Sequence, residues 1–224
     1  AKDVAIIEPA DTHYYQPAWT LVGAGTYDFD KTARSMSSVM PKDVTWIKDK
    51  AKGFNADENT VHTDKSGDMT YDYLVVAIGA ISNDFNTLGA QDHCLFLDSA
   101  GQARQAWNQI SQILREGKNS TINIVGAGAT GVELAAELAR VSKKLKRYNA
   151  SSLSINLIEA AHRVLPNSPQ KMSDKVLKEL EKSGVNVLLE TRISEVTANG
   201  MRTDVDKFLG ADIQFWAAGV KAPD

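Results

Sequence analysis

The feature that most constrains the fold is the glycine pattern in "IVGAGATGVELAAEL", which begins at Ile124. Gly126, Gly128 and Gly131 have the spacing GxGxxG, directly after an apolar run and directly before a pattern rich in Ala, Leu and Glu. This context is typical of a dinucleotide-binding loop between a strand and a helix. The first glycine makes the tight turn, the second lets the backbone approach a pyrophosphate, and the third lets helix and strand pack closely.

An acid at the end of the next predicted strand supports the same interpretation. "LSINLIE" is a strand-like run that ends at Glu159, where a carboxylate can accept hydrogen bonds from an adenosine ribose. An acid here disfavours a 2'-phosphate, so the pattern favours NAD over NADP. His162 and Arg163 lie close by in the sequence and leave NADP open.

Strand and helix patterns alternate along the rest of the chain. Buried strands are expected at residues 3–9, 73–80, 121–128, 153–160, 185–191 and 211–219, and helices at residues 98–117, 130–148 and 170–183. A long loop is expected through "HYYQPAWT", a turn at residues 21–30, and a small antiparallel meander between residues 44 and 72, with turns at 55–59 and 65–68. Helices between apolar strands predict an α/β fold with parallel sheets.

The two halves of the chain carry matching landmarks. "VAIIE" ends at Glu8 as "INLIE" ends at Glu159, and "YDYLVVAIG" ends at Gly79 as "ADIQFWAAG" ends at Gly219. We interpret this as two copies of one dinucleotide-binding unit, residues 1–96 and 97–224. The glycine loop and first strand of the first copy would then precede Ala1, so we expect the first domain to be incomplete.

Two such domains in tandem resemble the flavoproteins with two dinucleotide-binding domains, the glutathione-reductase-like fold, in which one domain holds FAD and the other NAD(P)H. "AIGAISNDFNTLGAQDHCLFLDSAGQARQ", "IVGAGATGVELAAEL", "EAAHRVLPNSPQKMS" and "FWAAGVKAPD" resemble type II NADH dehydrogenase, the single-subunit NADH:quinone oxidoreductase family. In the first 70 residues, "DTHYYQPAWTLVGAG" and "VMPKDVTWIKD" look closer to sulfide:quinone oxidoreductase.

The resemblance implies a set of cofactor-binding residues in each half. For NAD(H) these are Gly126, Gly128, Ala129, Thr130, Gly131, Glu159, Ala218 and Gly219. For FAD they are Glu8, Gln16, Pro17, Ala77 and Gly79. Glu8 would hold the adenosine ribose of FAD, and the segment of Gln16 and Pro17 would run close to the isoalloxazine.

Glu133 is the candidate catalytic residue. It lies two positions after Gly131, and the corresponding acid of the family sits near the nicotinamide and the flavin. The alternative is structural, because an acid near a helix N-terminus is favoured by the helix dipole. Glu137, one turn later, is expected to be a surface or interdomain residue.

Composition and spacing exclude several other classes of function. The net charge of -3 provides no basic field for nucleic acid, and no apolar run is long enough to cross a membrane. The four histidines have no metal-ligand spacing, so no metal site is expected. Cys94 is the only cysteine, whereas sulfide oxidation in the sister family uses a pair; a second cysteine outside these residues would keep that alternative open.

The resemblance implies hydride transfer from NADH to FAD and reoxidation of the flavin by a membrane quinone. It also implies peripheral association with the cytoplasmic face of the inner membrane, through segments outside these residues, and allows a homodimer. We expect the 224 residues alone to bind FAD weakly. A non-catalytic fragment that binds NAD(H) without turnover is the other alternative.

Overall fold

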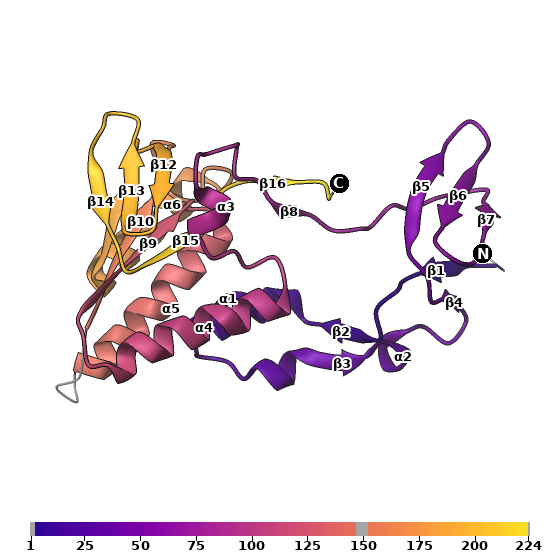
Figure 1. Cartoon of the computed structure of the whole chain (residues 1–224), viewed down its shortest axis with the longest axis horizontal. Helices are drawn as coiled ribbons and strands as arrows, with labels where there is room; N and C mark the ends of the chain where they lie inside the picture. The colour runs from indigo at the N-terminus through magenta and orange to yellow at the C-terminus, as the bar shows by residue number, and fades with distance from the viewer. Residues whose placement is uncertain (1–2, 147–151, 224) are drawn as a thin grey trace. The chain divides into compact units, whose positions relative to one another are not determined.

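The computed structural model describes residues 3–146 and 152–223, and the chain divides into two compact units (Figure 1). The first unit comprises Ala1–Tyr15 and Asp30–Ile78. The second comprises Gln16–Phe29 and Gly79–Asp224. Segment 16–29 is therefore packed with the C-terminal part of the chain. The functional division into residues 1–96 and 97–224 stays a prediction.

Four parallel strands form the central sheet of the second unit (Figure 1). They are β9 (Ser120–Val125), β10 (Leu153–Ile158), β11 (Val185–Leu188) and β15 (Ile213–Trp216), in the spatial order β11-β10-β9-β15. Their register places the last residues in one row: Leu188 opposite Ile158, Ile158 opposite Val125, and Val125 opposite Trp216. The segments that follow these strands therefore emerge side by side at one edge of the sheet.

A row of three asparagines fixes this register. Asn123, Asn156 and Asn186 are paired across β9, β10 and β11. The Asn186 side-chain amide donates to Asn156 Oδ1 at 2.9 Å, and that of Asn156 donates to Asn123 Oδ1 at 2.8 Å. A slip by one residue would leave these amides without their partners, so the row specifies the alignment that the apolar residues alone leave open.

Three helices pack on this sheet, and the sequence predicted each of them. They are α4 (Ala100–Arg115), α5 (Ala129–Lys146) and α6 (Gln170–Ser183). The Ser99 hydroxyl caps α4 by accepting from the Gln102 N–H, and α6 ends at Gly184, whose φ of 88° lies in the left-handed range. Their inward side chains join the sheet in one apolar core that includes Ile110, Leu134, Leu138, Leu180 and Phe215. The predicted helical end at Tyr148 lies outside the described residues.

An antiparallel layer lies between β11 and β15 in the chain. It consists of β12 (Ile193–Thr197), β13 (Gly200–Thr203) and β14 (Phe208–Gly210). Val196 and Met201 pack with Ile158 and Trp216 in a second apolar cluster. The short strand β8 (Ile81–Ser82) pairs with β16 (Val220–Lys221), and α3 (Ala90–His93) follows β8.

The first unit contains three small sheets. β1 (Ala5–Ile7) pairs in parallel with β4 (Thr45–Ile47), and β2 (Thr12–Tyr14) pairs antiparallel with β3 (Ala33–Ser35), which is followed by α2 (Met36–Val39). The predicted meander is confirmed as β5 (Ala51–Asn55), β6 (Thr60–Thr63) and β7 (Asp68–Thr70).

Asp49 ties the start of this meander to its second turn. Its carboxylate accepts the backbone N–H groups of Lys50, Lys65 and Ser66 at 2.7–2.9 Å. Burial acts to raise the pKa of Asp49, but the hydrogen bonds from Ser66, Lys65 and Lys50 together outweigh it and hold the pKa well below its usual range.

Four expectations about the N-terminal half were wrong in whole or in part. Residues 73–80 form no buried strand: Tyr73 is 94% exposed and Val75 is 86% exposed. An apolar run becomes a strand only where neighbours satisfy its backbone, and β1 and β4 pair only with each other among the described residues. β1 is parallel, as expected. It is not buried, for the same reason, and Ile6 is 37% exposed.

The expected loop through "HYYQPAWT" is instead structured. It contains β2, a short 3-10 helix, η1 (Gln16–Ala18), and α1 (Trp19–Gly23). The expected turn at residues 21–30 begins only after Gly23, where Gly25 has a φ of 70°, and a second 3-10 helix, η2 (Phe29–Thr32), follows. Packing of α1 against α4 and α5 explains this difference, because tertiary contacts stabilise a helix too short to form alone.

Candidate functional site

The glycine loop joins β9 to α5, and its three glycines have different surroundings. Gly126 has a φ of 99°, and a Cβ at this position would lie 2.7 Å from the Ala217 carbonyl. A Cβ at Gly131 would overlap the carbonyl oxygen of Gly126, so this glycine lets α5 begin against the loop. A Cβ at Gly128 would meet nothing within 4 Å. Gly128 is therefore the glycine whose open face is available to a ligand.

The start of α5 presents, beside this open face, backbone N–H groups that have no partner inside the helix. The first helical hydrogen bond runs from Val132 N to Gly128 O at 3.0 Å. The N–H groups of the residues between them come before the first intrahelical bond, as at any helix N-terminus. Such groups carry partial positive charge and bind anions.

Glu159 lies immediately after β10, next to the glycine loop. Its Oε2 accepts the N–H of Ala127 at 2.7 Å, and its Oε1 accepts the N–H of Ala161 at 2.9 Å. A carboxylate has about four acceptor positions, so each oxygen keeps one for a ligand hydroxyl. The two backbone bonds hold the half-buried side chain in one orientation at the loop.

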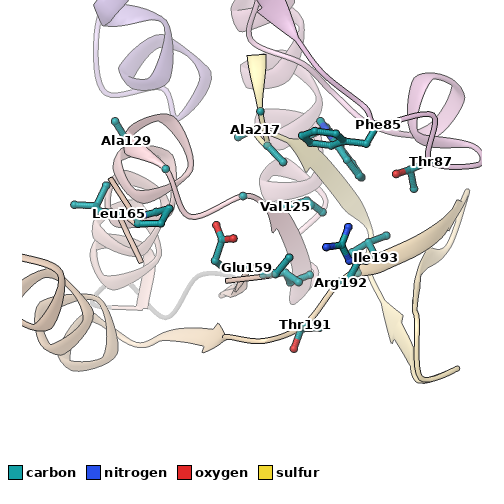
Figure 2. A pocket seen from close by; sticks show the side chains of 18 of the residues that line it. Phe85, Thr87, Val125, Ala129, Glu159, Leu165, Thr191, Arg192, Ile193 and Ala217 are labelled. Carbon is teal, nitrogen blue, oxygen red and sulfur yellow. The ribbon is translucent and has the colours of Figure 1, made fainter. Parts of the chain in front are cut away.

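These elements surround a cavity of about 610 Å³ at the edge of the sheet where the four parallel strands end (Figure 2). Six of the residues expected to bind NAD(H) line it: Gly126, Gly128, Ala129, Glu159, Ala218 and Gly219. Thr130 and Gly131 do not line it; Gly131 is buried beneath the loop. A cavity of this size is within the range that cofactors occupy.

Much of the lining comes from residues to which the sequence assigned no role in the site. They are Phe85 and Thr87 before α3, residues 165–168 before α6, residues 191–193 after β11, and Trp216. Figure 2 shows Leu165 on one side of the cavity and Phe85 on the other, with Glu159 between them. Residues 191–193 follow a parallel strand, so the rule that ligands bind beyond the carboxyl ends of such strands could have indicated them.

Glu133 lies on α5 but does not line this cavity. Its Oε2 accepts a hydrogen bond from the Thr20 hydroxyl at 3.0 Å, so the side chain is directed at α1. Thr20 follows closely after Gln16 and Pro17, both exposed in the same unit. The structure thus brings Glu133 into contact with α1, the helix that follows the segment expected to run along the flavin. Glu137, by contrast, pairs with Arg140 at 2.7 Å on the surface of α5.

The remaining FAD candidates are divided between the two units. Glu8 follows β1 and accepts the N–H of Ala10 at 2.7 Å. Ala77 is exposed, and Gly79 has a φ of 82° with open space around its Cα. Gln16 and Pro17 lie in the second unit. The assignment of these residues to FAD stays a prediction.

Cys94 is buried in the second apolar cluster. Burial raises the pKa of the Cys94 thiol to about 12, so the thiol is neutral at physiological pH. Within the described residues, no group of three or more His, Cys, Asp or Glu side chains is arranged to hold a metal ion. The helices of that same part of the chain are all too short or too polar to cross a membrane.

The amino-acid sequence is similar to those of two kinds of quinone oxidoreductase. Type II NADH:quinone oxidoreductase of Haemophilus influenzae is 40% identical over 180 residues, which cover 69% of this chain and 40% of that protein. The Staphylococcus aureus protein of the same name is 27% identical over 234 aligned positions, covering 98% of this chain and 58% of that protein. Mitochondrial sulfide:quinone oxidoreductase of Mus musculus is 47% identical over 79 residues, 35% of this chain and 18% of that protein. The chain thus spans less than two thirds of each relative.

Solved structures show the same fold. NDH2 from Plasmodium falciparum in complex with NADH superimposes with a TM-score of 0.83 at 22% identity, over 99% of this chain and 51% of that one. Sulfide:quinone oxidoreductase from Aquifex aeolicus gives 0.82 at 15% identity, over 99% of this chain and 53% of that one. These likenesses confirm the α/β, two-dinucleotide-domain fold class. A model of the pyridine nucleotide-disulphide oxidoreductase family matches residues 1–224, and the chain belongs to this family.

Proposed function

We propose that this chain is the NADH-binding part of an NADH:quinone oxidoreductase and that NADH occupies the 610 Å³ cavity. The observation that carries the proposal is the pairing of two sites at adjacent strand ends. An open glycine loop and a helix N-terminus follow β9, and a fixed carboxylate follows β10. In a bound dinucleotide the pyrophosphate lies at the glycine loop and the adenosine ribose lies at the acid that ends the neighbouring strand. The similarity to type II NADH:quinone oxidoreductases supports the choice of donor and acceptor.

Each lining residue then has a role in binding. The backbone of Gly128 and the N-terminus of α5 bind the pyrophosphate, and Glu159 accepts hydrogen bonds from the hydroxyls of the adenosine ribose. Ala218 and Gly219, which follow β15, contact the other half of the dinucleotide. NADH supplies a hydride and FAD passes the electrons to the quinone when both are bound. Glu8, Gln16, Pro17, Ala77 and Gly79 are the residues we assign to FAD.

We assign Glu133 a role near the reacting rings. Its support is the hydrogen bond from Thr20, which belongs to the helix α1 that follows the segment of Gln16 and Pro17. A carboxyl group there can position the reduced flavin or relay to the quinone the protons that it takes up when it is reduced to a quinol.

The test of this role is Glu133→Gln in the complete protein, assayed with NADH and menadione. The proposal predicts that turnover falls at least about tenfold while the affinity for NADH is retained, as expected when a residue acts in the reaction rather than in binding. Glu137→Gln is the matched control, because it changes an acid on the same helix that pairs with Arg140. Unchanged turnover in the Glu133 variant would refute the role.

The alternative donor is sulfide, favoured by the short, 47% identical match to the mouse enzyme. The neutral, buried thiol of Cys94 argues against it, because persulfide chemistry needs a reactive thiolate. Quinone reduction by sulfide without NADH would support the alternative. NADH binding without reduction of any quinone by the complete protein would favour a non-catalytic role.

A further inference from the structure

An exposed phenylalanine forms one wall of the cavity. Phe85 is 59% exposed and lines the cavity. A methyl group at Gly219 would overlap Cζ of the Phe85 ring and lie 2.8 Å from its Cε2. The ring edge thus lies over Gly219, in the connection between β15 and β16. Figure 2 shows Phe85 on the side of Ala217 and away from Leu165.

The backbone that presents this ring is strained. Phe85 has a φ of 52° and Asn86 a φ of 55°, so two successive residues with side chains adopt the left-handed conformation. A bulky residue rarely does so, because its Cβ approaches the backbone carbonyl. Such strain persists only where surrounding contacts enforce it, and it is concentrated at functional sites.

Hydrogen bonds hold the turn in place on both sides. The Asn83 side-chain oxygen accepts the N–H of Phe85 at 2.9 Å, and the Trp216 indole N–H donates to the Asn83 carbonyl at 2.9 Å. The Asp84 side chain accepts the N–H of Asn86 at 3.1 Å. The position of the ring is therefore determined by β15 and by the turn, and it does not depend on packing of the ring into the core.

The order of the strands indicates which part of a dinucleotide the ring meets. Glu159 follows β10, the glycine loop follows β9, and Gly219 with Phe85 lies beyond β15. With the adenosine ribose on Glu159 and the pyrophosphate on the loop, the second nucleoside extends toward β15. The exposed ring is thus at the nicotinamide end.

We propose that Phe85 is a stacking platform for the nicotinamide ring. The inference rests on the function proposed above and adds a residue that selects for an aromatic group at that end of the ligand. Stacking between aromatic rings contributes modestly beyond burial of area. One face of the nicotinamide would lie on Phe85 and leave the other face free.

The experiment compares NADH with ADP-ribose, which lacks the nicotinamide, by quenching of tryptophan emission, since Trp216 lines the cavity. Phe85→Ala and Phe85→Leu should weaken the affinity for NADH about three- to tenfold and the affinity for ADP-ribose less than about twofold. Phe85→Tyr should bind NADH as the wild type does, because it keeps the aromatic face. Phe54→Ala, which removes a 45% exposed phenylalanine from the first unit, is the matched control and should leave the affinity for both ligands unchanged.

The outcomes separate the two proposals. Equal weakening of NADH and ADP-ribose by Phe85→Ala would show that the residue only maintains the turn and would overturn the inference. Unchanged NADH binding in Phe85→Ala and Phe85→Leu would also overturn it. If wild-type protein binds ADP-ribose and NADH with equal affinity, the platform is refuted while the proposed cavity stands. If it binds neither, the proposed function itself fails, and the inference fails with it.

Discussion

Replacement of Gly128 by alanine separates ligand binding from folding. The added methyl group would meet no protein atom within 4 Å, and the φ of Gly128 lies outside the left-handed range. The free energy of unfolding should therefore change by less than about 1 kcal/mol, because a compatible Gly→Ala change acts mainly on the unfolded chain. The same methyl group would occupy the space where the proposed pyrophosphate approaches the backbone.

The loss of affinity follows from the hydrogen bonds that the methyl group would prevent. If two bonds from backbone N–H groups to phosphate are lost, at about 1.5 kcal/mol each, binding weakens by about 3 kcal/mol, or roughly 100-fold in Kd. NADH titration followed by tryptophan emission measures the affinity, and urea denaturation measures the stability.

Gly131→Ala is the matched control, with the opposite expectation. Its methyl group would overlap the carbonyl oxygen of Gly126, a backbone atom that cannot move aside freely. Overpacking of this kind costs about 1–3 kcal/mol of stability. Wild-type affinity for NADH in Gly128→Ala would refute the proposed position of the pyrophosphate, because it would show that no part of NADH occupies the space that the methyl group fills.

Further predictions concern three other positions. Glu159→Ala should weaken the binding of NADH at least about tenfold and also lower stability, since two partly buried N–H groups lose their charged acceptor; unchanged affinity in a calorimetric titration would contradict this. Asp49 has a lowered pKa in the folded state, so its stabilisation is present above the unfolded pKa of about 3.9 and is lost as the pH falls through the folded value. Asp49→Asn should therefore lower the Tm at pH 7, and the difference should shrink below about pH 4; a pH-independent difference would exclude this linkage. Cys94, with its raised pKa, should react with iodoacetamide at pH 8 only after denaturation, and rapid labelling of the native protein would refute its burial.

The second unit could be predicted well because its signals are local. Apolar runs of strand length alternate with helical patterns, and caps such as Ser99 and Gly184 mark where helices begin and end. The asparagine row shows what composition could not indicate: the polar residues of these strands pair with one another across the sheet. The register of the parallel strands could therefore be determined only from the structure.

The first unit was harder to predict because strand formation depends on partners. Residues 73–80 have the apolar character of a buried strand, yet they form none, since no neighbouring strand of the described residues satisfies their backbone. Tyr73 and Val75 are exposed as a result. Periodicity reports which residues favour burial, and it does not report whether a sheet is present to bury them.

The candidate site was predicted in part. The glycine loop and Glu159 are recognisable because their chemistry requires fixed residue types directly after strands. Phe85 and residues 191–193 come from connections whose paths depend on tertiary packing, so spacing alone could not place them at the cavity. Positive φ at Phe85 is likewise invisible in the sequence, because nothing about phenylalanine favours that conformation.

The most direct test of the central claim is a calorimetric titration of the purified protein with NADH and, separately, with NADPH. The account predicts one NADH per chain and at least about tenfold weaker binding of NADPH, because the Glu159 carboxylate repels a 2'-phosphate. It further predicts that Glu159→Ala reduces this preference. Absence of NADH binding, or a preference for NADH that persists unchanged in Glu159→Ala, would contradict the account.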